Sequence, residues 1–123
     1  MNLPEPKTIG PISRTDVVRY QGASGDFNPA HHDELFAINA GMPAPIVVGM
    51  LPAGMLAAWA TDHFGPQKLR GVRFRWKRPV WPEDSLTLSG ALDSEDEERF
   101  TLALEAVNQD GVVVVQGWTT FVR

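Results

Sequence analysis

The segment from residue 49 to about residue 64 constrains the fold more than any other part of the chain. It is rich in Ala, Leu, Met and Trp and carries no charged residue before Asp62. A helix that is apolar nearly all round is a buried helix. Pro52 fits a helix only in its first turn, so we predict that the helix starts near residues 49–51. The rest of the chain must therefore enclose this helix.

The hydrophobic pattern changes after this segment. Four later stretches have the composition and alternation typical of strands: residues 69–80, 86–93, 99–108 and 112–122. The polar stretches between the last three have the length of hairpin connections. One buried helix followed by antiparallel strands predicts an α+β domain in which a sheet wraps around the helix.

The first part of the chain contains shorter elements, separated by Gly and Pro. We predict a flexible, Pro-rich segment at residues 1–7, a short strand at 9–13, a helix through Tyr20 that Thr15 caps, and a helix from Pro29 to about Asn39 that Gly41 closes.

Size and composition narrow the class of protein. A chain of 123 residues is expected to form one domain, residues 1–123, and its apolar fraction of 43% is that of an ordinary soluble protein. The net charge of −4 argues against a nucleic-acid partner, and the absence of cysteine excludes a disulfide framework or a thiol nucleophile. The first residues lack the pattern of a signal peptide, and no apolar run approaches the roughly 20 residues that span a bilayer. We therefore expect a cytoplasmic protein without a membrane partner.

Two ionisable side chains stand close together before the buried helix. Asp26 and His31 lie five residues apart, across a loop that enters a helix at Asn28-Pro29, where Asn is a preferred N-cap and Pro suits the first position. An acid and a base at this spacing can share one water molecule. Residues 45–50 then bring flexible backbone to the start of the buried helix. An acid, a base and a backbone donor suffice to add water next to a carbonyl. The alternative is that Asp26 caps a turn and His31 lies on the surface.

These residues also carry a family resemblance. The chain contains Tyr20-x3-Ser24-Gly25-Asp26-x-Asn28-Pro29-x-His31-x-Asp33, then Ala40-Gly41-Met42, Pro45-Ile46-x2-Gly49-Met50 and Phe74-Arg75-x2-Arg78-Pro79-Val80. This series resembles the signature of the MaoC-like, hydratase-2 type enoyl-CoA hydratases and spans most of the chain. The chain departs from the family at two positions. Val48 stands where the family often has His, and Ala30 where it often has a bulky aliphatic residue, as in outlying members that include subunits of heteromeric hydratases.

The resemblance implies a hot-dog fold and the reversible hydration of a trans-2-enoyl-CoA to an (R)-3-hydroxyacyl-CoA. Asp26 and His31 map onto the family's catalytic pair. The Gly49 N–H would polarise the thioester carbonyl, and the alternative is a loop glycine that permits an unusual backbone angle. No metal or redox cofactor is expected, because coenzyme A enters as part of the substrate.

Candidate substrate contacts lie in the same motifs and on the first strand after the helix: Ser24, Asn28, Met50, Arg73 and Arg75. Arg73 and Arg75 alternate with apolar residues, so one face of this strand is basic. The alternatives are a solvated outer sheet face and contacts with the phosphates of coenzyme A.

The expected partner is a second hot-dog chain. The valine run at residues 112–115 would aggregate as an exposed edge, which argues against a monomer. The partner is either an identical copy or a different subunit, as in heteromeric hydratases for bulky steroid side-chain substrates. A noncatalytic acyl-CoA-binding protein and a thioesterase are the remaining alternatives.

Overall fold

Five strands and three α-helices make up this computed structural model, which describes all residues 1–123. In chain order the elements are β1 (Lys7–Ile9), α1 (Arg14–Ser24), the 3-10 helix η1 (Pro29–His31), α2 (Glu34–Asn39), α3 (Met50–Phe64), the 3-10 helix η2 (Pro66–Lys68), β2 (Leu69–Trp76), β3 (Leu86–Glu95), β4 (Arg99–Asn108) and β5 (Val113–Val122). The strands form one antiparallel sheet in the order β1-β3-β4-β5-β2. No helix combines the length and the apolar character needed to cross a bilayer.

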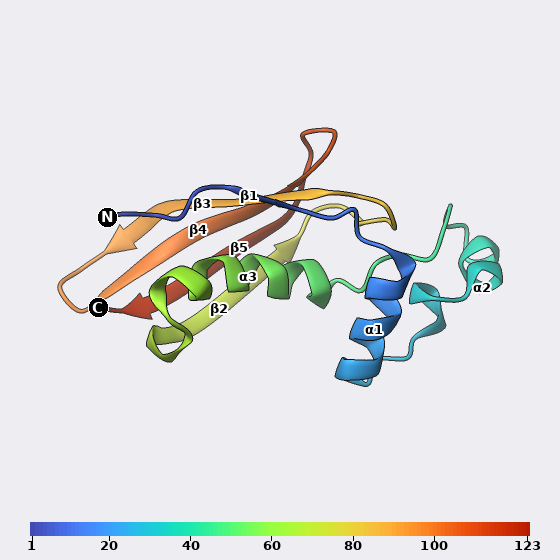
Figure 1. The fold of residues 1–123 in the computed structure, drawn as a ribbon, viewed down its shortest axis with the longest axis horizontal. Helices are drawn as coiled ribbons and strands as arrows, with labels where there is room; N and C mark the ends of the chain where they lie inside the picture. Colours follow the sequence, from blue (N-terminus) through green and yellow to red (C-terminus); the bar gives the residue numbers. More distant parts are fainter.

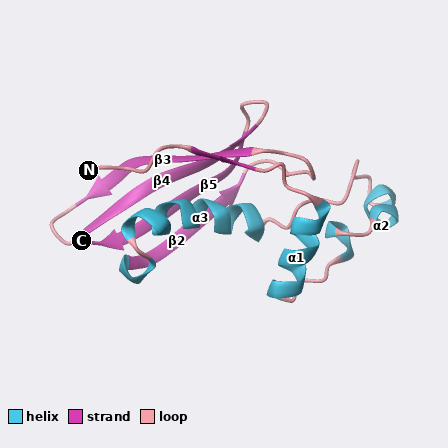
Figure 2. Ribbon diagram, viewed as in Figure 1, coloured by secondary structure: helices cyan, strands magenta, loops and turns pink.

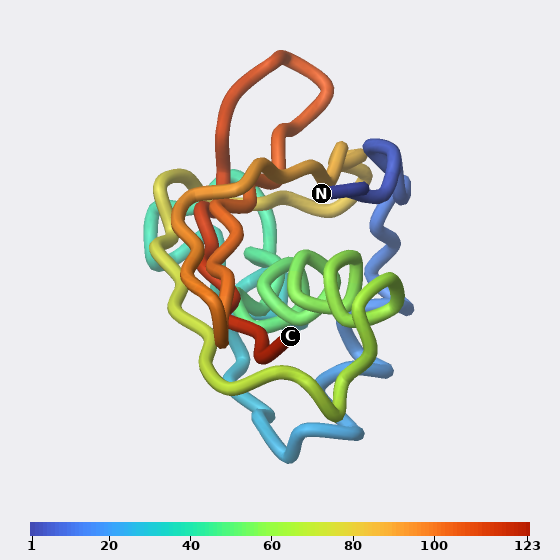
Figure 3. Tube along the Cα trace, turned by 90° about the vertical axis from the view of Figure 1, so that its left-hand side faces the viewer, coloured from blue at the N-terminus to red at the C-terminus, as the bar shows by residue number.

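The sheet curves around α3, as the sequence predicts. Figure 1 shows α3 lying along the strands, and the view along the long axis in Figure 3 shows the strands passing around it. The helices α1 and α2 lie beyond the start of α3, away from the sheet, whereas both chain termini lie at the opposite end (Figure 2). The predicted α+β arrangement is therefore confirmed.

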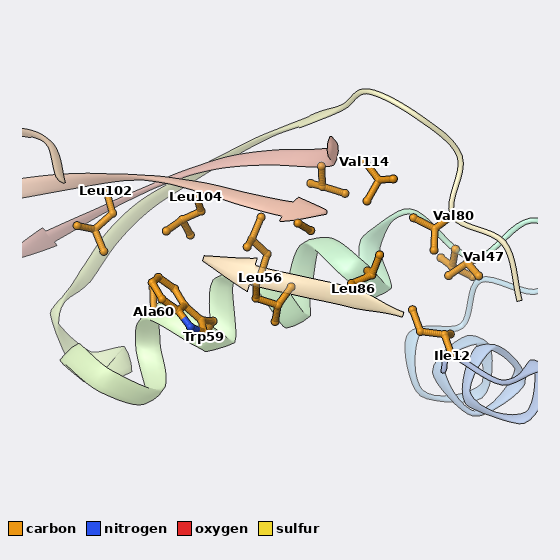
Figure 4. Packing of buried hydrophobic residues seen from close by; sticks show 14 of the residues in the cluster. Ile12, Val47, Leu56, Trp59, Ala60, Val80, Leu86, Leu102, Leu104 and Val114 are labelled. Atoms are coloured by element: carbon orange, nitrogen blue, oxygen red, sulfur yellow. The ribbon is translucent and has the colours of Figure 1, made fainter. Parts of the chain in front are cut away.

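The core forms where α3 meets the inner face of the sheet. Leu56 and Ala60 of α3 are fully buried and pack in one cluster with Leu102 and Leu104 of β4 (Figure 4). Four more apolar residues extend this cluster towards the start of α3: Ile12, Val47 and Val80 of the connecting segments and Leu86 at the start of β3. The core thus continues from the sheet to the loops that surround the first turn of α3.

A glycine sets the distance between α3 and the sheet. A Cβ on Gly90 of β3 would lie 2.5 Å from Leu104 Cδ2 and 3.0 Å from Trp59 Cζ3. Real Cβ atoms do not approach other atoms so closely, so only glycine allows Trp59 to pack at this depth.

The structure corrects several predicted boundaries in the first part of the chain. The first strand occupies Lys7–Ile9 rather than residues 9–13, because Gly10, with φ of 105°, and Pro11 turn the chain away from the sheet. Residues 1–7, expected to be flexible, contact α3 through two hydrogen bonds, in which Trp59 Nε1 donates to the Glu5 carbonyl and His63 Nε2 bonds the Asn2 carbonyl.

The helix that Thr15 was predicted to cap begins two residues earlier than expected. Ser13 is its N-cap and forms a capping box with Asp16, and the hydrogen bond from the Ser13 backbone lowers the pKa of Asp16. The helix also continues past Tyr20 and through Gly22, up to the left-handed C-cap Gly25. Ser13 rather than Thr15 is the N-cap, because the side chains of Ser13 and Asp16 each accept a hydrogen bond from the backbone N–H of the other residue.

The single helix predicted over residues 29–39 is two helices. The turn η1 ends at His32, whose φ of −142° is not helical. Asp33 then accepts a hydrogen bond from Phe36 N and starts α2 as a new helix. A strong capping residue inside the predicted helix thus divides it.

The valine run is not at an edge of the sheet. β5 pairs with both β4 and β2, so Val114 and Val115 are buried in the middle of the sheet. The exposed edge predicted at residues 112–115 is therefore not present. The edges are instead the three-residue β1 and the eight-residue β2.

We expect Gly90→Ala to lower the free energy of unfolding by about 1–3 kcal/mol, because the added methyl group overpacks the contact with Trp59. Gly54→Ala in α3 is the matched control, since its added Cβ meets nothing within 4 Å. A glycine in a helix interior costs about 0.5–1 kcal/mol, so this control should stabilise the protein. Denaturant unfolding measures both variants, and equal effects of the two would contradict the close packing.

Candidate functional site

A pocket of about 330 Å³ lies at the start of α3, and we call it the α3 pocket. It combines His31, Gly49 and Trp76 with the cations Lys77 and Arg78, and apolar residues complete its lining. The pocket thus joins the end of η1, the first turn of α3 and the end of β2. Two of the predicted functional residues, His31 and Gly49, meet in it.

His31 is held in a defined tautomer. Its Nδ1 lies 2.8 Å from the carbonyl oxygen of Ile46, and the Ile46 amide in turn donates to the Ala30 carbonyl at 3.0 Å. A carbonyl only accepts hydrogen bonds, so we assign the ring proton to Nδ1. Nε2 is then left as the basic nitrogen, on a half-buried side chain that lines the α3 pocket.

Asp26 lies on the exposed loop that leads to η1. Its Oδ1 accepts a hydrogen bond from the Asn28 amide at 3.2 Å, and its own amide donates to Ser24 Oγ at 3.3 Å. Asp26 is not among the residues that line the α3 pocket, and no hydrogen bond joins it to His31. The carboxylate thus organises its loop while one of its oxygens remains without a protein partner.

Ser24 and Asn28 also bond within this loop. Ser24 Oγ receives the Asp26 amide, and Asn28 Oδ1 caps η1 by accepting from the Ala30 amide at 3.0 Å, as predicted. Met50, by contrast, is half exposed at the start of α3. The structure therefore gives both polar candidates a local structural task.

Gln21, which was not among the predicted site residues, organises the loop that carries Asp26 and Asn28 from the interior of the protein. Its side chain is only 2% exposed, and its Nε2 donates to the carbonyls of Asp26 and Asn28 at 2.9 and 3.2 Å. Its Oε1 bonds His32 Nδ1 at 3.1 Å. A buried amide that satisfies three groups fixes the loop. The only signal in the sequence was its position within the motif.

Gly49 is required by space and not by backbone angle. Its φ of −57° and ψ of −33° are helical, so the alternative of an unusual backbone angle is wrong. A Cβ at this position would lie 3.0 Å from Trp76 Nε1. The amides of Gly49 and Met50 donate no hydrogen bond within the chain, as expected for the first turn of a helix. These free donors lie at the positive end of the α3 dipole.

The basic residues of β2 and those that follow it lie in two different places. Phe74 packs against Gly117 and Leu56 on the inner face, so Arg73 and Arg75 lie on the outer face of the sheet. The guanidinium of Arg73 stacks over Trp118 at 4.5 Å from the ring centroid. These two candidates are therefore not brought to the α3 pocket of their own chain.

Lys77 and Arg78 line the α3 pocket instead, and we call them the cation pair. Neither takes part in an ion pair. Of these two residues, only Arg78 stands in the family series, and neither was predicted as a substrate contact. The signal in the sequence that could have identified them is the adjoining Pro79-Val80 of the family series. In the structure the Val80 carbonyl accepts a hydrogen bond from the Val47 amide at 2.9 Å, which ties this loop to the pocket. No cluster of three metal-ligating side chains is found in the structure.

Comparison with known proteins places the chain in a family. The model of the MaoC like domain matches residues 4–115. The (R)-specific enoyl-CoA hydratase of Aeromonas caviae is 31% identical over 107 residues, which cover 83% of this chain and 79% of the relative. The 3-oxo-4,17-pregnadiene-20-carboxyl-CoA hydratase beta subunit of Mycobacterium tuberculosis is 28% identical over 110 residues, or 89% of this chain and 84% of the relative.

Other relatives are much longer. The chain spans 7% of the peroxisomal hydratase-dehydrogenase-epimerase of Saccharomyces cerevisiae, with 40% identity over 63 residues, and 26% of the probable enoyl-CoA hydratase 2 of Dictyostelium discoideum, with 29% identity over 77 residues. The same domain thus occurs within longer proteins.

Solved structures have the same fold. The (R)-hydratase from A. caviae superimposes with a TM-score of 0.84 at 23% identity and covers 98% of this chain and 95% of that one. The ChsH1-ChsH2 complex from M. tuberculosis gives 0.86 at 24% identity, with 98% and 94% covered. An antiparallel sheet wrapped around a central helix is the architecture that these structures share with this chain. The chain therefore belongs to the MaoC-like domain family and has the hot-dog fold.

Proposed function

We propose that this chain catalyses the reversible hydration of a trans-2-enoyl-CoA to a 3-hydroxyacyl-CoA, with the (R) configuration. One observation carries the proposal. The basic Nε2 of His31 and the free amide of Gly49 belong to the same pocket, which the cation pair also lines. The family and the A. caviae relative, named as an (R)-specific enoyl-CoA hydratase, support this reaction.

The proposed mechanism needs one base, one orienting group and one carbonyl donor. His31 Nε2 takes a proton from water as the water oxygen bonds to carbon 3 of the substrate, and carbon 2 then receives a proton from the same site. The Nδ1 bond to the Ile46 carbonyl keeps Nε2 available for this transfer. Asp26 orients the water through its free carboxylate oxygen. The double bond is thereby replaced by a C–OH and a C–H bond, and no electrons are exchanged with a cofactor.

The Gly49 amide stabilises the charge that develops during the reaction. When water adds to carbon 3, negative charge moves onto the thioester oxygen, and a fixed N–H donor at that oxygen lowers the barrier. Because the donor is a backbone group, Val48 in place of the frequent His still leaves it available. The positive end of α3 adds to the stabilisation.

We expect wild-type protein to add one water to a short linear or a bulky 2-enoyl-CoA, and Asp26→Asn and His31→Ala each to reduce the rate by about 10²–10⁴-fold. Mass spectrometry of the products measures this. His63→Ala is the matched control, because this imidazole bonds the Asn2 carbonyl at the other end of α3 and does not line the α3 pocket. Full hydration by His31→Ala would refute the proposed base. Release of free coenzyme A would indicate a thioesterase, and binding without turnover a noncatalytic protein.

We further propose that the cation pair binds phosphate groups of coenzyme A. Both residues are free of ion pairs and line the α3 pocket, and guanidinium and ammonium groups suit phosphate oxygens. Arg73 and Arg75, the sequence-based candidates for this contact, lie on the outer face.

We expect Lys77→Ala and Arg78→Ala to raise KM roughly tenfold, since a hydrogen bond to a charged group contributes about 1.5 kcal/mol or more. The effect should vanish with an enoyl-pantetheine thioester, which lacks the nucleotide phosphates. The variants Arg73→Ala and Arg75→Ala are measured in parallel. A larger rise of KM in that pair would favour a phosphate site on the outer face.

A second hot-dog chain is the proposed partner, and exposed apolar residues favour it. Several large side chains around η1 and α2 lie in water in the single chain: Phe27 at 66%, Leu35 at 68%, Phe36 at 44% and Ile38 at 56% exposure. Three of these four residues belong to the six-residue helix α2, and exposed apolar groups gathered in one region are typical of interfaces or ligand grooves. The ChsH1-ChsH2 complex and the hydratase beta subunit from M. tuberculosis support the alternative of a heteromeric hydratase for bulky substrates.

We expect the purified chain to form a homodimer in light scattering coupled to size exclusion, because burying these side chains offsets the cost of association. Leu35→Glu should shift the protein towards monomer, whereas Arg99→Glu at the far end of the sheet should not. A wild-type monomer without hydratase activity would instead support the heteromeric alternative, with a different hot-dog chain as the missing partner.

A further inference from the structure

The indole of Trp76 makes an unusual contact with the start of α3. Its Nε1 donates a hydrogen bond of 2.8 Å to the carbonyl oxygen of Gly49, 27 positions earlier in the chain. The side chain is 48% exposed, so water could have satisfied this donor. The N–H is instead directed to the backbone of the residue that carries the proposed carbonyl donor.

This bond is the one side-chain restraint at the start of α3. The helices α1 and α2 begin at Ser13 and Asp33, whose side chains cap them. Gly49 has no side chain, and α3 has no side-chain cap. The helical bond from Ala53 N to the Gly49 carbonyl is long, at 3.4 Å. A glycine at an uncapped helix end is free to change its backbone angles unless another group holds it.

The geometry of the contact restrains the relevant peptide groups. The Gly49 carbonyl shares a peptide plane with the Met50 amide, so the Trp76 bond fixes the direction of that amide and the ψ angle of Gly49. The ring also covers the Cα of Gly49, because a Cβ there would lie 3.0 Å from Nε1 and 3.4 Å from Cδ1. The Gly49 N–H belongs to the preceding peptide plane, which the Leu51 amide holds by donating to the Val48 carbonyl at 3.0 Å, so the two bonds together fix the peptide groups on both sides of Gly49.

We propose that Trp76 is a positioning residue, which holds the backbone of Gly49 so that the free amides of Gly49 and Met50 keep the direction needed to polarise the thioester carbonyl. This inference rests on the proposed hydratase function. A preorganised donor is worth far more in catalysis than a mobile one, because it does not have to reorient during the reaction. Phe at this position would keep the wall of the pocket but lose the hydrogen bond.

The test compares two Trp→Phe variants that each remove one indole bond to a backbone carbonyl. Trp76→Phe is expected to lower kcat by roughly 10–100-fold, because displacement of a catalytic group by about 1 Å costs up to 10²-fold, while KM changes less than about threefold. Trp59→Phe is the matched control. Its Nε1 donates to the Glu5 carbonyl at 3.0 Å, away from the α3 pocket, so its loss should lower thermal stability and leave kcat within about twofold.

Amide NMR supplies a readout independent of turnover. In Trp76→Phe the order parameters of the Gly49 and Met50 amides should fall from about 0.85 towards 0.6, and in Trp59→Phe they should not. Rigid amides or an unchanged kcat in Trp76→Phe, with an active wild type, would overturn this inference and leave the hydratase function intact. A wild type without hydration would overturn the proposed function itself and the inference with it.

Discussion

The burial of α3 inside a single antiparallel sheet is the constraint on which the rest of the structure depends. An apolar helix of this length needs cover on most of its surface, and one sheet provides it only by curving. Close approach at Gly90 lets the indole of Trp59 fill the space between the layers. At the start of the helix, by contrast, the first backbone amides have no partner within the chain and lie at the α3 pocket.

The location of the α3 pocket follows from this arrangement. The first turn of α3 emerges where β2 ends, and the loop that carries η1 closes the remaining side. Three segments far apart in the sequence thus meet around free amide groups. Rigid secondary structure holds Gly49, the proposed carbonyl donor, whereas the proposed acid and base, Asp26 and His31, lie on a segment that Gln21 ties together from the interior.

Periodicity predicted the parts of the fold that are determined locally. Alternation in β3, β4 and β5 reflects burial of one face of each strand, and the uninterrupted apolar character of α3 reflects burial of the whole helix. The predicted bounds of these elements were therefore close to those in the structure. Competition between caps was harder to predict. Ser13 and Asp33 start helices that the sequence placed elsewhere, because the outcome depends on paired hydrogen bonds rather than on composition.

Relations between strands were beyond the reach of the pattern. Strand order is not evident from the sequence. The valine run of β5 was therefore predicted to be an edge, although β5 lies between two neighbouring strands. Basic and apolar residues alternate along β2, but the sequence does not show which of the basic residues lie beyond the end of the sheet. Arg73 and Arg75 were therefore predicted as substrate contacts and Lys77 and Arg78 were not, and only the tertiary structure separates the two pairs.

Both termini lie at the end of the molecule away from the α3 pocket (Figure 1). Polypeptide joined to either end would extend from the far side of the domain and leave the entrance to the pocket unobstructed. This architecture suits the domain to tandem fusion, in which one chain carries several catalytic modules in series. It offers a geometric reason why the same domain recurs as a small fraction of much longer relatives.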